Sequence, residues 1–90
     1  MSDTHNIRKV EYKDSLEYKN PQLAAEWHPT KNGDLKPNQI GVGNEYQAWW
    51  LYPYDDPETG KHFDFEWQAR VDNRHNQRLR GERGVPFLSG

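Results

Sequence analysis

The sequence predicts a small α+β domain built on a central β-hairpin with short helices on either side of it. An aromatic run and an alternating aromatic stretch are separated by a polar turn, which is the pattern of two antiparallel strands. Helix-start residues precede the first strand, and an Arg-rich stretch that ends at a glycine follows the second. At 90 residues the chain has room for one hydrophobic core.

The core of this domain is expected to be aromatic. Leu, Ile, Val and Phe together supply only fifteen of the 90 residues, which is low for a folded protein. Four Trp, five Tyr and three Phe provide the missing apolar area, because each ring can bury about 150–250 Å². The net charge of -2 is also too small to oppose a compact fold.

The N-terminal residues 1–15 are expected to form a flexible arm or an edge strand, and residues 16–90 to form the domain. A short helix is predicted over residues 20–27. Asn20 is a favourable N-cap residue, and Pro21 suits the first helical position.

Two side chains of this helix, Leu23 and Trp27, lie four residues apart and can face the core together. The following stretch, residues 30–44, is rich in Gly, Asn, Pro and Lys and is predicted to be a loop, with a turn at Gly33. The apolar residues expected to anchor this loop in the core are Leu35, Ile40 and Val42.

The two predicted strands cover residues 46–52 and 63–70. The first is an almost continuous aromatic run, whereas the second alternates apolar and polar residues with period two. An acidic turn over residues 55–60 joins them into a hairpin with one aromatic and one charged face.

A second short helix is predicted over residues 71–80, ended by Gly81. The C-terminal tail, residues 84–90, is apolar and is expected to return to the core.

Charge is unevenly distributed along the chain. Residues 51–66 contain five acidic residues and one lysine, a local net charge of -4. Residues 68–90 contain five arginines and two acidic residues, a local net charge of +3. The molecule is therefore expected to be a dipole.

Several function classes are disfavoured by what the sequence lacks. The absence of cysteine excludes disulfides, thiolate metal sites and a cysteine nucleophile. The sequence also contains no catalytic triad order, P-loop or dinucleotide-binding glycine motif, so we expect no enzymatic activity. No apolar run is long enough for a membrane span, so a cytoplasmic protein without a membrane partner is expected.

Residues 20–35 read N-P-x-L-A-x-E-W-H-P-T-K-N-G-D-L, and further matching positions follow along the chain. They are Trp49-Trp50, Glu66-Trp67-x-Ala69, Asn73-Arg74, Pro86 and Ser89-Gly90. This pattern resembles the zinc-ribbon or treble-clef zinc finger domain of bacterial and phage proteins, over about 70 of the 90 residues. The resemblance implies a treble-clef arrangement of the hairpin and its flanking helices.

Members of that family carry zinc ligands in the motifs W-W-x-C, G-H-x-W and C-P-x-C. The corresponding positions in this chain are aromatic or aliphatic: Tyr52, Phe65, Val85 and Leu88. His62 is an alternative for the second position because the acidic loop makes the alignment ambiguous there. Two of the four donors required for structural zinc are missing in either alignment, so we expect a degenerate member with no metal and no cofactor. The four side chains are expected to meet as a hydrophobic plug at the former metal position.

The resemblance implies a non-catalytic binding module, and relatives with this fold often contact DNA. Guanidinium groups bind phosphates, so an Arg-rich C-terminal segment predicts contact with DNA or RNA. The residues predicted to make it are Arg70, Arg74, Arg78, Arg80 and Arg83.

Three alternatives remain open from the sequence. The arginines could form a solvated face neutralised by the acidic loop, and the module would then bind a protein partner or tandem copies of itself. Trp49 and Trp50 could stack on bases, although core packing is the simpler interpretation. The acidic loop with His62 could hold a cation, although a charged turn explains it as well. The closing motif at the last residues fits either a fragment of a longer tandem protein or a minimal copy.

Overall fold

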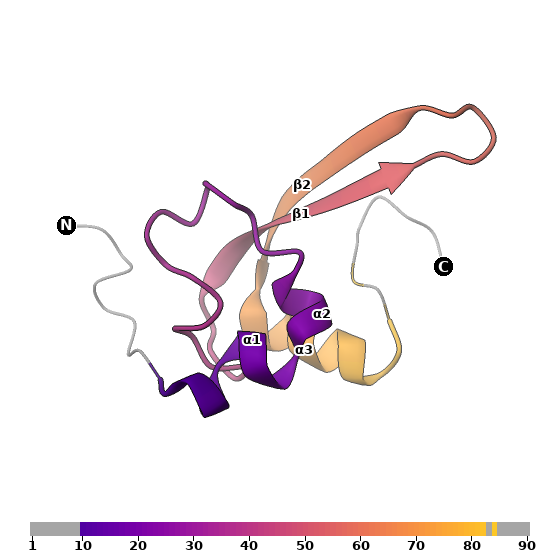
Figure 1. Cartoon of the computed structure of the whole chain (residues 1–90). Helices are drawn as coiled ribbons and strands as arrows, with labels where there is room; N and C mark the ends of the chain where they lie inside the picture. The colour runs from indigo at the N-terminus through magenta and orange to yellow at the C-terminus, as the bar shows by residue number, and fades with distance from the viewer. Residues whose placement is uncertain (1–9, 83, 85–90) are drawn as a thin grey trace.

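The centre of the fold is an antiparallel hairpin of β1 (Gln47–Asp55) and β2 (His62–Arg70), seen in a computed structural model that describes residues 10–82 and residue 84 (Figure 1). Gln47 lies opposite Arg70, and Asp55 lies opposite His62. The connecting turn contains Gly60, whose φ of 74° is in the left-handed region that glycine adopts without strain. The predicted hairpin and the α+β class are confirmed.

The inner half of the hairpin packs on the core through one face only. Alternate residues of a strand point to opposite sides, so Ala48 and Trp50 of β1 share a face with Trp67 and Ala69 of β2. Trp50 is fully buried, and its indole N–H donates to the Ala69 carbonyl oxygen at 3.0 Å. This ring is the central element of the aromatic core that the composition predicts.

Two single-turn helices, α1 (Leu16–Lys19) and α2 (Pro21–Ala24), precede the hairpin, and only α2 lies within the residues 20–27 predicted as one helix. They are separated at Asn20, whose φ of -144° breaks the helix because the residue before a proline avoids the helical region. The side-chain oxygen of Asn20 accepts a hydrogen bond from the Leu23 N–H at 3.3 Å, which confirms its role as N-cap of α2.

The end of the predicted first helix was wrong, because the helix stops at Ala24. Beyond it, Trp27 is paired as a short β-bridge with Trp50 on the free edge of β1. The Leu51 N–H donates to the Glu26 carbonyl at 2.7 Å, and the His28 N–H donates to the Trp49 carbonyl at 3.1 Å. Backbone pairing with the sheet is therefore more favourable for this segment than another helical turn.

The third helix, α3 (Val71–Leu79), follows β2 directly and agrees with the predicted segment to within one residue. Gly81 has a φ of 81°, as expected for a glycine that ends a helix. Val71 is fully buried and fixes the start of α3 against the core. Figure 1 shows all three helices gathered at one end of the molecule, while the turn of the hairpin projects away from them.

The core brings together residues from the helices, the loop and the inner hairpin. The Trp27 and Trp50 rings meet edge to face with centroids 5.6 Å apart. Leu35 and Ile40 are buried, as predicted for the loop anchors, and Val42 is partly buried beside them. The buried apolar residues are Leu16, Leu23, Ala24, Trp27, Leu35, Ile40, Ala48, Trp50 and Val71.

Residues 10–15 of the predicted N-terminal arm are described, and they lie against the loop. The Val10 N–H donates to the Gln39 carbonyl at 3.2 Å. A single 3-10 turn follows at Tyr12–Asp14, and Ser15 is fully buried in a bridge with Gly41. Among the described residues, no helix is long and apolar enough to cross a membrane.

The loop residues Asn32 and His28 tie the loop to the hairpin through hydrogen bonds. The Asn32 carboxamide accepts from the Trp49 N–H at 2.8 Å and donates to the Trp49 carbonyl at 2.9 Å. His28 Nδ1 accepts from the N–H groups of Thr30 and Lys31, so its other nitrogen donates to the Glu66 carboxylate at 2.8 Å. Both side chains are buried, and neither is available for chemistry.

Candidate functional site

Two of the four former metal positions face each other across the hairpin. Tyr52 and Phe65 are direct partners in the register. Phe65 also stacks on Phe63 and Tyr54, with ring centroids 6.0 and 6.1 Å apart. The other two predicted plug residues, Val85 and Leu88, lie outside the described residues. The pairing of Tyr52 with Phe65 is observed, and the plug of all four side chains at the former metal position stays a prediction.

The residues at the former metal positions do not fit zinc, because a phenol and a phenyl ring replace two ligands and the chain has no cysteine. Within residues 10–82 and 84, no group of three His, Cys, Asp or Glu side chains is arranged to hold a metal ion. Zinc therefore has no part in the chemistry described below.

His62, the alternative ligand, is held between two carboxylates at the outer end of the hairpin. Its Nδ1 lies 2.7 Å from Asp55, and its Nε2 lies 2.7 Å from Asp64. The hydrogen bond to Asp55 is the main cause that raises the pKa of His62, and the hydrogen bond to Asp64 raises it further. When the ring is protonated, both nitrogens donate to carboxylates. The imidazolium then joins the two strands as a charge clamp and offers no lone pair to a metal.

The five predicted phosphate-binding arginines do not form one strip. Arg74 is fully buried, and its guanidinium carbon lies 4.9 Å from the Trp50 ring centroid and 5.1 Å from that of Trp67. Its Nη1 donates to the Glu26 carboxylate at 2.7 Å. Arg74 is therefore a core residue that joins α3 to the segment after α2.

Arg80 is exposed and Arg70 is half-buried, and both are engaged with carboxylates. Arg70 donates two hydrogen bonds to Asp72, at 2.7 and 3.0 Å, and lies 3.7 Å from Glu45. Arg80 donates to Glu82 at 3.1 and 3.4 Å. Their positive charges are thus partly balanced where they stand. Arg83 lies outside the described residues.

Among the arginines that the structure describes, Arg78 differs because the hydrogen-bond partner of its guanidinium group is neutral. Its Nη2 donates to the side-chain oxygen of Gln22 on α2 at 3.2 Å. In the part of the chain that the structure describes, no carboxylate lies within 4.0 Å of its guanidinium group. Arg78 lines a cavity of about 370 Å³ together with Lys19 and His75. We call this region, formed by Lys19, Gln22, His75, Arg78 and Arg80, the basic end.

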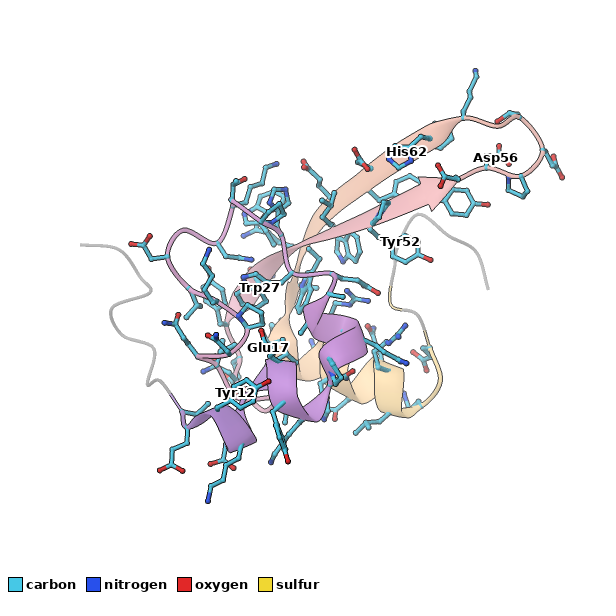
Figure 2. All side chains as sticks on the ribbon, in the orientation of Figure 1. Tyr12, Glu17, Trp27, Tyr52, Asp56 and His62 are labelled. Carbon is cyan, nitrogen blue, oxygen red and sulfur yellow. The ribbon has the colours of Figure 1, made fainter. Side chains whose placement is uncertain are left out.

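The opposite end of the molecule is acidic. Four acidic side chains lie there against one lysine, Lys61. They are Asp55 at the end of β1, Asp56 and Glu58 in the turn, and Asp64 on β2. Asp56 accepts from the Glu58 N–H and the Thr59 hydroxyl, which holds its pKa below the usual range. Figure 2 shows Asp56 and His62 at the outer end of the hairpin, far from the helices. We call this region the hairpin tip.

The two tryptophans considered for base stacking lie on opposite faces of β1. Trp50 belongs to the core, whereas Trp49 is half-buried, with the Lys31 ammonium 4.4 Å from its ring centroid. Lys31 in turn contacts Glu66 at 2.8 Å. The pair is therefore not a continuous stacking platform.

Comparison with protein families gives one match, to the family described as "Probable Treble clef zinc finger domain", over residues 23–83. The chain belongs to this family. The match begins in α2 and includes the loop, the whole hairpin and α3, whereas Lys19 and Gln22 of the basic end lie before it. The treble-clef assignment expected from the motifs is confirmed. Searches among curated proteins and solved structures gave no match.

Membership in a zinc-finger-like family indicates a binding module. This chain has the fold-defining motif of the treble-clef family but non-ligating residues at Tyr52 and Phe65. The described residues combine Arg74 in the core, Arg78 with a neutral hydrogen-bond partner, and a separation of charge between helices and hairpin.

Proposed function

We propose that this treble-clef domain is a non-catalytic module that binds DNA or RNA through its basic end. The observation that carries the proposal is the position of Arg78 and Lys19 around one cavity, at the opposite end of the molecule from the acidic hairpin tip. Arginine and lysine bind phosphate oxygens by charge-assisted hydrogen bonds and release counterions from nucleic acid. The acidic tip would repel a polyanion, so the dipole favours approach with the helices first.

This contact surface differs from the linear arginine strip. Arg74 contributes to stability, while Arg78 supplies a charge whose hydrogen-bond partner is neutral, and Arg80 extends the basic region if a phosphate displaces Glu82. Arg70 and Arg83 stay candidate contacts from the sequence alone. The Arg80–Glu82 pair is exposed, and such pairs are worth little, so a phosphate can compete for this guanidinium group.

A protein-binding function is the second candidate, and the projecting hairpin favours it. The exposed Phe63, at 41 % of its full accessible area, stands beside the acidic tip, and the domain as a whole has a net charge of -2. A partner for this surface would be basic and partly apolar, such as another protein or a tandem copy of the same domain.

The experiment that separates the two candidates is binding of labelled single-stranded and duplex oligonucleotides at several salt concentrations. The nucleic-acid proposal predicts retention at low salt and a steep loss of affinity as salt increases. A chain that retains neither oligonucleotide at low salt would contradict it. Salt-tolerant binding to one protein, lost in a Phe63→Ser variant, would support the alternative.

A further inference from the structure

The cavity at the basic end lies between the junction of α1 and α2 and the C-terminal part of α3. Its volume of about 370 Å³ is within the range of sites that bind small ligands or single chemical groups. Side chains from segments more than fifty residues apart in sequence line it, including Lys19, Asn20, His75 and Arg78. Both cationic side chains therefore face one volume from two different elements.

The hydrogen bonds around Asn20 define the tautomer of His75. Asn20 Oδ1 accepts from the Leu23 N–H, so the amide nitrogen is the group that faces His75. That nitrogen lies 3.1 Å from His75 Nδ1 and donates to it. Neutral His75 consequently carries its proton on Nε2, which is a hydrogen-bond donor.

The charges around this imidazole are mainly positive. Burial, and after it the charge of Lys19, lowers the pKa of His75. Among the described residues that line the cavity, Glu82 is the acidic one, and Arg80 donates two hydrogen bonds to its carboxylate. The four charged side chains Lys19, Arg78, Arg80 and Glu82 together carry a net charge of +2.

We infer that this cavity binds one phosphate group, which Lys19 and Arg78 contact by charge and His75 contacts through its Nε2 proton. An anion supplies what the cavity lacks, because it offsets the repulsion between Lys19, Arg78 and the imidazole. The inference rests on the proposed nucleic-acid function for the origin of the phosphate, which would be a terminal or backbone phosphate. A free nucleotide offers the same chemistry.

The inference has a pH dependence with a definite sign. A bound backbone phosphate, whose charge does not change near neutral pH, favours the charged imidazolium, so the pKa of His75 rises on binding and affinity increases as the pH falls through that value. A terminal phosphate has a second pKa of about 6 and loses charge over the same range, so with such probes the rise of the His75 pKa, and not the affinity, gives the sign. Glu82 keeps its negative charge over this range, because its hydrogen bonds with Arg80 lower its pKa.

The test is an NMR titration of the full chain that follows the His75 ring signals. The probes are inorganic phosphate, a 5′-phosphorylated single-stranded oligonucleotide and the same oligonucleotide with a 5′-hydroxyl. We expect saturable shifts and a raised His75 pKa with phosphate. Preference for the 5′-phosphorylated strand indicates a terminal phosphate, and equal binding of the two strands indicates a backbone phosphate.

Variants make the test specific to the cavity. Lys19→Gln and Arg78→Gln should each weaken phosphate binding about tenfold, because each removes one charge-assisted contact. Glu82→Gln should strengthen it, since it removes the acidic group from the cavity. Lys61→Gln is the matched control, with the same loss of charge at the hairpin tip, and should leave binding unchanged.

Two outcomes separate this inference from the proposed function. If oligonucleotides bind but the His75 signals do not move, and Arg78→Gln binds like wild type, the cavity is not the site and the inference is wrong. If inorganic phosphate raises the His75 pKa but no oligonucleotide is retained, the cavity is an anion site and the nucleic-acid function is wrong. Equal effects of Lys19→Gln and Lys61→Gln would also overturn the inference.

Discussion

The basic end and the hairpin tip contain similar kinds of charged side chains but arrange them differently. At the tip, His62 is clamped between Asp55 and Asp64, so opposite charges satisfy each other on an exposed hairpin. At the basic end, Lys19 and Arg78 line one cavity, and the hydrogen-bond partner of Arg78 is an uncharged amide. Counting charges along the sequence does not distinguish these cases. What matters for binding is which charges the fold leaves unbalanced.

The largest expected effect concerns the arginine that belongs to neither region. Replacing Arg74 by Ala should lower the free energy of unfolding by about 3–5 kcal/mol, because it leaves the buried Glu26 carboxylate unpaired and removes the group between two tryptophan rings. Chemical denaturation measures this directly. The control is Arg80→Ala, an exposed arginine, which should change stability by less than about 1 kcal/mol. Equal effects of the two substitutions would place Arg74 on the surface.

A smaller effect is expected at Phe65, in the outer half of the hairpin. Phe65→Ala should destabilise the domain more than Phe63→Ala, by about 1–2 kcal/mol, because Phe65 is half-buried between its neighbours whereas Phe63 is exposed. Thermal unfolding of both variants gives the difference. The same scans on the wild type with added zinc, or with a chelator, should show an unchanged midpoint. A midpoint that rises sharply with zinc would disprove replacement of the metal by apolar contacts.

The pKa values of the two histidines should be shifted in opposite directions, and each pKa reports on one of the two regions. The carboxylates raise the pKa of His62 above about 6.5, whereas burial and Lys19 lower the pKa of His75 below it. The contribution of His62 to stability is present below its unfolded pKa and is lost as pH rises through the folded value. The contribution of His75 to stability is present above its unfolded pKa and is lost as the pH falls through its folded pKa.

NMR titration of the ring protons gives both values in one experiment. Asp64→Asn should bring the pKa of His62 back toward about 6.5 and leave His75 unaffected. Identical pKa values in the wild type would mean that the clamp and the cavity do not exist in solution.

Local sequence signals predicted the elements whose structure depends on neighbouring residues. The alternation in β2, the N-cap at Asn20 and the glycine after α3 each act within a few residues, and each appears in the structure. The α1 turn also has such a signal, since the Ser15 hydroxyl accepts from the Tyr18 N–H at 3.2 Å. The predicted arm over residues 1–15 includes Ser15, so the prediction placed no helix start at this residue.

The candidate site could not be predicted in the same way because it depends on distant pairs. Arg74 and Glu26 are 48 residues apart, and Asn20 and His75 are 55 residues apart. The spacing of five arginines shows none of these contacts. One signal was available: a core rich in tryptophan can hold a guanidinium group, and Glu26 in the opening motif could be its partner. Lys19 and His75 gave no signal of their own.

The most direct test of the account compares one charge reversal at each end. Arg78→Glu and Lys61→Glu change the net charge equally, at the basic end and at the hairpin tip. We predict that fluorescence anisotropy with a labelled oligonucleotide shows an affinity loss of about tenfold or more for Arg78→Glu, and a reduction of the salt slope by about one. Lys61→Glu should bind like wild type. Equal losses for the two variants, or no loss for Arg78→Glu, would contradict binding through the basic end.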